Sequence, residues 1–318
     1  MKTCVVLDDY QDAALQSADW SRIADRVSVS TVREFLANED AVVERIGDAE
    51  IVCIMRERTP FPASLLDRLP KLKLIVTSGM RNAAIDLAAA QKNGVTVSGT
   101  ATSGSPPLEL TWGLILGLAR QIAVENAGFR ANGPWQSSVG VDLNGRQLGI
   151  IGLGKIGTQM AKVAGAFGMK VVAWSPNLTD ERAAAAGVER AASKEALLET
   201  SDFVSLHLVL APSTRGLIGE QELRRMKPEA FLINTARAPI VDQAALIRAL
   251  EEKWIAGAGL DVFETEPLPA GHPFRTLGNV LATPHLGYVS QNNYRTFFGE
   301  GIEDIEAWLD GAPIRTLV

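Results

Sequence analysis

A glycine-rich turn between an apolar run and a helical stretch constrains this chain more than any other feature. The pattern G-x-G-x-x-G follows residues 148–151, which suit a strand, and precedes residues 158–167, which suit a helix. Its first glycine allows a tight turn, its second lets the backbone approach a phosphate, and its third lets the helix pack closely on the strand. The helix N-terminus would then face the anion. The dinucleotide-binding residues predicted from this turn are Gly152, Gly154, Lys155, Ile156 and Gly157.

The composition excludes several other classes of protein. The net charge of -6 and the lack of a local Lys/Arg cluster argue against a nucleic-acid partner. No apolar segment approaches the roughly 18 residues of a membrane span, and the first strand-like run is too short for a signal peptide. Cys4 and Cys53 lie in apolar runs, which favours buried thiols over a disulfide or a metal site. We therefore expect a cytoplasmic protein with no metal and no membrane contact.

Strand-like and helix-like segments alternate along the chain, which predicts parallel sheets covered by helices. A first series of strands is expected over 3–7, 27–32, 50–55, 72–76 and 95–98. A second series is expected over 147–151, 170–174, 203–206, 230–234, 256–260 and 279–282. The predicted fold class is α/β with two doubly wound parallel-sheet domains. A Rossmann nucleotide domain (100–287) is inserted into a flavodoxin-like substrate domain (1–99 and 288–318).

The expected helices include 40–46, 83–91, 242–252 with Asp242 as its N-cap, and 290–309. Pro106 and Pro107 open a long apolar helix over 108–126, and a glycine-rich and polar arm follows at 128–145. A helix that is apolar around most of its surface is buried somewhere. We expect this helix and the arm to pack on a second copy in a homodimer; the alternative is a helix that only bridges the two domains.

The three histidines are the candidate proton donors, because histidine titrates near neutral pH. His285 lies just past an expected strand, with Pro284 before it and Gly287 shortly after it, which suggests a fixed loop. His207 also ends a strand, where it lines the nucleotide cleft or is satisfied in the core. His272 suits an exposed loop. A single histidine is more often structural, so none is assigned from its position alone.

Arg237 and Glu266 also follow expected strands of the second series. The carboxyl ends of parallel strands share one edge of the sheet, so these side chains can converge with His285. Taken singly, Arg237 is better explained as a helix cap or a surface ion pair, and Glu266 as a solvated loop charge.

Taken together and in this order, the features resemble the D-isomer-specific 2-hydroxyacid dehydrogenase family. The matching stretches are 148–157, 204–219, 231–242, 259–268 and 283–287, and the resemblance extends over essentially the whole chain. It implies an NAD(P)-dependent enzyme that transfers a hydride between the cofactor and a small 2-keto or 2-hydroxy acid. It also implies that Arg237, Glu266 and His285 are the catalytic residues.

The implied roles are physically consistent. The guanidinium of Arg237 would bind the substrate carboxylate and polarise the ketone oxygen. His285 would give a proton to that oxygen in reduction and act as the base in oxidation. Glu266 would orient the ring and favour its charged form.

The resemblance extends to residues that bind the two ligands. Cofactor contacts are implied for His207, Thr235, Ala236 and Asp261, with Asp261 on the nicotinamide amide. Ser78 and Gly79 are implied to hold the substrate carboxylate through their amides. Arg56 lies in a stretch similar to the Arg-x-Arg-Thr loop of phosphoglycerate dehydrogenases, where an arginine reaches an anionic substrate. The alternative for Arg56 is a solvated loop balanced by Glu57.

The sequence departs from the family pattern after the second nucleotide-domain strand. Ser175 stands where the family usually has the aspartate that binds the ribose 2′-hydroxyl and repels a 2′-phosphate. Ser175 and Asn177 could donate to a phosphate and Arg182 could approach it, whereas Asp180 and Glu181 argue the other way. The cofactor is therefore NAD(P), with a slight preference for NADP.

Two other functions stay open. One is oxidation of the phosphoglycerate type, which the Arg56 loop would support. The other is a non-enzymatic NAD(P)-sensing protein like the corepressors of this family. A formate dehydrogenase is disfavoured, because that branch has glutamine where Glu266 stands.

Overall fold

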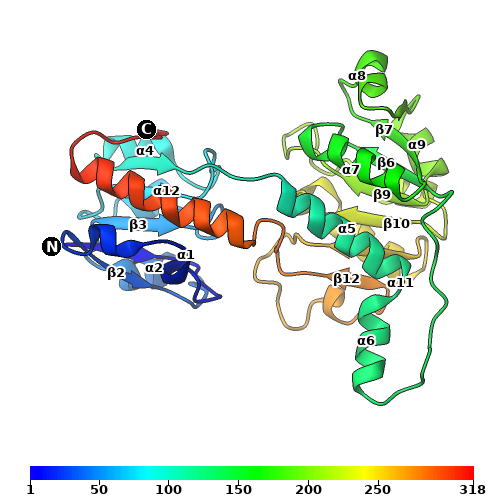
Figure 1. Cartoon of the computed structure of the whole chain (residues 1–318), viewed down its shortest axis with the longest axis horizontal. Coiled ribbons are helices and arrows are strands. Elements are labelled where there is room, and N and C mark those ends of the chain that lie inside the picture. Colours follow the sequence, from blue (N-terminus) through cyan, green and yellow to red (C-terminus); the bar gives the residue numbers. More distant parts are fainter. The chain divides into compact units, whose positions relative to one another are not determined.

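The computed structural model describes all 318 residues, which divide into two compact units. Unit 1 comprises Met1–Ser103 and Val289–Val318, and unit 2 comprises Gly104–Tyr288. Each unit is a parallel sheet with helices on its faces (Figure 1), so the predicted α/β fold class is confirmed. None of the helices combines the length and the apolar character that crossing a membrane requires.

Unit 1 holds a five-stranded parallel sheet in the order β2-β1-β3-β4-β5, the flavodoxin-like order. Its strands are β1 (Lys2–Val6), β2 (Val27–Thr31), β3 (Ile51–Ile54), β4 (Leu74–Thr77) and β5 (Thr96–Gly99). Its helices are α1 (Ala14–Ser17), α2 (Glu39–Ile46), α3 (Ala63–Leu66), α4 (Leu87–Lys92) and α12 (Gln291–Leu309). Every residue of β3 and β4 is buried, as expected for central strands covered on both faces.

The helix expected over 83–91 begins later than predicted, at Leu87. The Asp86 side chain accepts a hydrogen bond from the backbone N–H of Ala89 and so caps the helix. The residues before Asp86 form a turn instead. The cap was not predicted because alanines lie on both sides of Asp86, and alanine is compatible with a helix at every one of these positions.

Unit 2 holds a seven-stranded parallel sheet in the order β12-β11-β10-β9-β6-β7-β8, which is the Rossmann order with one added strand. Its strands are β6 (Gln147–Ile151), β7 (Lys170–Trp174), β8 (Glu189–Arg190), β9 (Phe203–Leu206), β10 (Phe231–Asn234), β11 (Gly257–Leu260) and β12 (Val280–Ala282). Its helices are α5 (Ser105–Ala119), α6 (Ile122–Arg130), α7 (Lys155–Ala166), α8 (Asp180–Ala185), α9 (Lys194–Thr200), α10 (Glu220–Arg225) and α11 (Gln243–Glu251).

The single long helix predicted over 108–126 is wrong, because the structure breaks it into α5 and α6 (Figure 1). Between them, Gln121 takes the left-handed conformation with φ 52°. The two helices also differ in burial: α5 has seven buried residues, whereas α6 has none. The sequence did not reveal this break, since Arg120 and Gln121 at the junction are both good helix formers.

Candidate active site

The glycine turn of unit 2 leaves no room for larger residues at two of its three positions. Gly152 has φ +108°, and a Cβ atom added to it would lie 2.6 Å from the His207 carbonyl oxygen. A Cβ on Gly157 would lie 2.2 Å from the carbonyl oxygen of Gly152. A Cβ on Gly154 would meet nothing within 4 Å, so the backbone there faces open space. These are the three requirements of a dinucleotide turn.

Helix α7 begins directly after this turn, at Lys155. Its N-cap is Gly154, which offers no side chain to the first amides of the helix. Unsatisfied amides at the start of a helix, together with the helix dipole, form an anion-binding position. The residues present therefore fit the pyrophosphate of a dinucleotide.

His285 and Glu266 are in direct contact. The Nδ1 atom of His285 lies 2.7 Å from Oε2 of Glu266, and the two side chains are 19% and 20% exposed. The other carboxylate oxygen of Glu266 accepts a hydrogen bond of 2.9 Å from the backbone N–H of Phe263. A carboxylate anchored in this way fixes the orientation of the ring.

The loop that carries His285 is hydrogen-bonded to Asp261, which is fully buried. Its Oδ1 accepts hydrogen bonds from the Thr283 hydroxyl at 2.6 Å and the Leu286 N–H at 2.7 Å. Its Oδ2 accepts one from the Gly287 N–H at 2.8 Å. Burial raises the pKa of Asp261, and these hydrogen bonds oppose that rise. The partners bracket His285, which has φ +55°, so the carboxylate holds the loop in an uncommon backbone conformation.

Sequence reasoning missed this role of Asp261. The resemblance implied a contact with the nicotinamide amide, and that contact stays a prediction. Nothing in the local sequence could have shown that Asp261 and the loop at 283–287 meet, since they come from the ends of neighbouring strands β11 and β12.

Arg237 follows β10, the next strand along the sheet, in a turn braced by Asn234. The Asn234 side chain donates to the Arg237 carbonyl oxygen at 3.1 Å and accepts from the Ala236 N–H at 3.0 Å. The hydroxyls of Thr235 and Thr111 lie 2.7 Å apart, which joins this turn to α5. Arg237, Glu266 and His285 thus follow three adjacent strands at one edge of the sheet.

The other two histidines have different surroundings. His207 directly follows β9, and its Nε2 lies 2.8 Å from the Ser205 hydroxyl. Burial lowers the pKa of His207 to about 4, so its ring is neutral at pH 7. His272 is partly buried rather than exposed as expected, and its Nδ1 accepts a hydrogen bond from the Phe274 N–H. It caps a 3₁₀ turn, which is a structural role.

In unit 1, Arg56 lies against the Ser78–Gly79 loop. The Arg56 N–H donates to the Ser78 hydroxyl at 3.0 Å, and its carbonyl accepts from the Asn82 side chain at 2.6 Å. A Cβ atom on Gly79 would lie 3.1 Å from Nη1 of Arg56. Both backbone and guanidinium of Arg56 are therefore positioned by this loop.

The amides of Ser78 and Gly79 already donate within unit 1. The Ser78 N–H bonds to the Ile54 carbonyl at 3.2 Å, and the Gly79 N–H bonds to the Thr100 hydroxyl at 3.1 Å. These amides would have to exchange partners to hold a substrate carboxylate as the resemblance implied. Arg56 also lies near Glu57, with Nε 3.9 Å from Oε2, so both alternatives that the sequence left for it, substrate binding and a loop balanced by Glu57, stay open.

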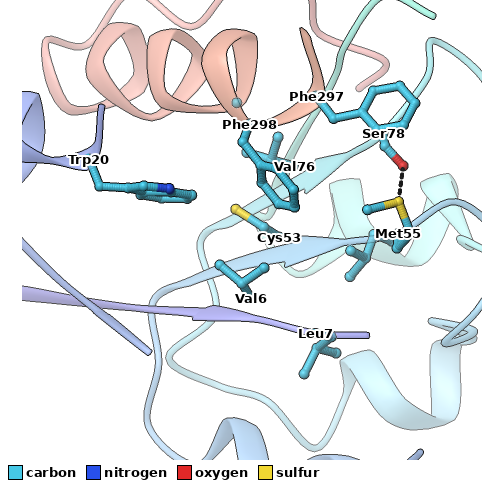
Figure 2. A pocket seen from close by; sticks show the side chains of 11 residues that line it. Val6, Leu7, Trp20, Cys53, Met55, Val76, Ser78, Phe297 and Phe298 are labelled. Atoms are coloured by element: carbon cyan, nitrogen blue, oxygen red, sulfur yellow. Dashed lines mark hydrogen bonds between the residues drawn. The ribbon is translucent and has the colours of Figure 1, made fainter. Parts of the chain in front are cut away.

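Below the same loop, unit 1 contains a small apolar cavity of about 20 Å³ (Figure 2). That volume suits roughly one water molecule. Figure 2 shows Ser78 and Met55 at one side, Trp20 at the other, and Cys53 and Phe298 between them. The Ser78 Oγ atom lies 3.2 Å from Met55 Sδ. Cys53 and Cys4 are free buried thiols, as predicted. The lining carries no acid or base, so this cavity is not the catalytic site. No group of three His, Cys, Asp or Glu side chains is arranged to hold a metal ion.

The chain is similar to known proteins over most of its length. Residues 112–287 match the sequence profile described as D-isomer specific 2-hydroxyacid dehydrogenase, NAD binding domain. A glyoxylate reductase from Thermococcus litoralis is 43% identical over 233 residues, which is 70% of this chain and 70% of that protein. A D-3-phosphoglycerate dehydrogenase from Methanocaldococcus jannaschii is 38% identical over 85% of this chain, which spans about half (51%) of that protein.

A crystal structure of a Ralstonia solanacearum oxidoreductase has the same fold throughout. It matches with a TM-score of 0.95 at 36% sequence identity, over 100% of this chain and 97% of the other.

Proposed function

The chain belongs to the D-isomer-specific 2-hydroxyacid dehydrogenase family, and from that premise we propose that it reduces a small 2-keto acid to a D-2-hydroxy acid with NAD(P)H. The observation that carries this proposal is the 2.7 Å contact between His285 and Glu266, at the same sheet edge as a glycine turn that fits a dinucleotide. The bound cofactor supplies or accepts the hydride.

The residues of the chain supply the proton and hold the substrate. With Nδ1 of His285 bonded to Glu266, the protonated ring donates from Nε2 to the ketone oxygen. In oxidation the neutral ring takes the hydroxyl proton at the same atom. Arg237 binds the substrate carboxylate, and its fixed positive charge favours the oxygen that becomes negative.

Glyoxylate and hydroxypyruvate are the proposed substrates, in keeping with the glyoxylate reductases among the relatives. Arg56, Ser78 and Gly79 are proposed to contribute to binding of the acid. The guanidinium of Arg56 against Gly79 favours a second candidate, a phosphorylated substrate of the phosphoglycerate type, because arginine matches phosphate geometry.

Steady-state assays with purified protein test these proposals. NADPH or NADH oxidation is followed at 340 nm with glyoxylate, hydroxypyruvate, pyruvate and 3-phosphohydroxypyruvate in turn. Turnover of an unphosphorylated keto acid supports the first candidate, and at least tenfold higher kcat/KM with the phosphorylated acid supports the second. Nucleotide binding without turnover of any acid would contradict an enzyme and support the sensor.

Two further properties are part of the proposal. NADP is preferred over NAD because Ser175 replaces the usual acidic residue after β7, which predicts a lower KM for NADPH than for NADH. The protein is a homodimer, since Phe129, Trp135 and Val139 expose 68%, 83% and 97% of their area. A monomer mass in light scattering would contradict the second property.

A further inference from the structure

We infer that Arg182 is the residue that binds the 2′-phosphate of NADP(H); this rests on the proposed nucleotide site of unit 2. Arg182 lies in the first turn of α8, after the loop that follows β7. No motif assigns it, because it stands seven positions beyond Ser175, where the family's acidic residue would be.

The side chain of Arg182 reaches back to the glycine turn. Its Nη1 donates to the Asn177 carbonyl at 3.3 Å, and its Nη2 donates to the Leu153 carbonyl at 3.5 Å. Leu153 lies between the first two glycines of the turn, and Asn177 lies in the loop after β7. The guanidinium therefore joins the carboxyl ends of β6 and β7. This is where a Rossmann sheet holds the adenosine ribose.

The two acidic residues beside Arg182 are bound elsewhere. Asp180 pairs with Arg190 at 3.1 Å. Glu181 accepts hydrogen bonds from its own backbone N–H and from the Thr179 hydroxyl at the start of the helix. Asp180 and Glu181, which had argued against NADP in the sequence, therefore do not neutralise Arg182.

The contacts of Arg182 are weak enough to be exchanged for a phosphate. Both acceptors are neutral carbonyl oxygens at the long end of the hydrogen-bond range. A phosphate oxygen offers a charge-assisted and bidentate alternative to the planar guanidinium. The loop between Ser175 and Thr179 contains no carboxylate that would repel this phosphate.

Binding of adenosine 2′,5′-bisphosphate and 5′-AMP, measured by isothermal titration calorimetry, isolates the 2′-phosphate. We expect R182A to weaken the bisphosphate about tenfold, as loss of an exposed charge-assisted pair would, and to leave 5′-AMP within about twofold. R182K should fall between R182A and the unmodified protein, because it keeps the charge but loses the planar fork. The matched control is R225A, an exposed arginine of the same unit that pairs with Glu199 at 2.6 Å and plays no part in the proposed site; it should change neither ligand.

Ionic strength provides a second measurement on the same proteins. Affinity for the bisphosphate should fall as KCl rises, more steeply than affinity for 5′-AMP, and R182A should remove most of that difference. An R182A variant that weakens both ligands equally, or neither, overturns the inference.

These outcomes differ from a failure of the proposed enzyme activity. If no keto acid is turned over but the bisphosphate still depends on Arg182, the enzyme proposal fails and the inference stands. If turnover is observed and binding does not depend on Arg182, the inference alone fails. If neither nucleotide binds, both are overturned.

Discussion

Two histidines follow strands at the same edge of the unit 2 sheet, and their surroundings separate them. His285 meets the carboxylate of Glu266, is about one-fifth exposed and has a left-handed backbone. His207 meets the hydroxyl of Ser205, and burial lowers its pKa to about 4. A hydroxyl cannot balance an imidazolium, whereas a carboxylate can.

The comparison shows that position at a strand end is not enough to assign an acid–base role. Both residues satisfy the general rule that sites of open α/β sheets form at the carboxyl edge. Both side chains are partly exposed, so the partner of the ring, a carboxylate for His285 and a hydroxyl for His207, is what distinguishes the two residues. The predictions below test this distinction.

Replacing His285 by Gln should give the largest effect. It removes the proposed proton donor, so kcat for the preferred keto acid should fall about a thousandfold. H207Q is the comparison variant: with saturating cofactor, which masks any loss of the contact implied for His207, it should change kcat less than about threefold. Stopped-flow or steady-state assays at 340 nm measure both variants. An H285Q enzyme with more than a tenth of the original kcat would remove the distinction between the two histidines.

E266Q should reduce kcat less, by about ten- to a hundredfold, since the ring stays in place but loses its charged partner. The diagnostic readout is the split between kcat and KM: kcat should fall while the KM of the keto acid stays within about twofold, because the change alters the partner of Nδ1 and not the groups that bind the acid. E264Q, a change in the same acidic loop, is the control. An unchanged kcat in E266Q would show that the 2.7 Å contact does not affect proton transfer.

D261N should reduce kcat less than E266Q does. It also distinguishes two roles of Asp261, support of the loop at 283–287 and contact with the nicotinamide amide. Asn has one acceptor oxygen instead of two, so the loop at 283–287 loses part of its support, at a cost of about 1–3 kcal/mol in unfolding free energy. Hydrogen exchange of Leu286 and Gly287 should become faster, and kcat should fall. A higher KM for the cofactor with unchanged exchange would instead support the implied contact with the nicotinamide amide. D48N, at an exposed site in unit 1, serves as the control.

His207 should affect stability with pH more than catalysis. Its pKa of about 4 in the folded state lies below the unfolded value near 6.5, so only the unfolded chain binds a proton between these values. The folded state is therefore favoured above pH 6.5 and loses this contribution as pH falls toward 4. H207N should flatten the fall in Tm over that interval, as measured by calorimetry. Equal slopes in H207N and the unmodified protein would show that the burial of His207 is not the cause.

Most strands and helices could be predicted from the sequence, because hydrophobic periodicity and turn-forming residues determine secondary structure over a few neighbouring positions. The bounds of β6, β7 and β9 agree with the prediction to the residue, and Asp242 caps α11 as expected. The two wrong helix boundaries lie where the sequence pattern gives no signal for a helix end. The left-handed break falls at Gln121, a residue type that favours helices, and the start of α4 depends on the Asp86 cap beside an alanine-rich run.

The candidate site was less accessible, since it depends on contacts between distant segments. Motif order identified the pair His285–Glu266, but not the carboxylate of Asp261 under the loop. The position of Arg182 likewise depends on a contact across 29 residues of chain, to Leu153.

The exposure of α6 has a consequence for the state of the molecule in solution. This helix has nine residues and no buried side chain, whereas isolated helices shorter than about 12–15 residues are marginal in water. The coil and helical states of this segment would be close in free energy until a second copy of the chain covers Ile122 and Phe129. Helix formation and dimerisation would then be coupled. Circular dichroism of a dilute sample and of a concentrated one would then report different helix contents for the same polypeptide.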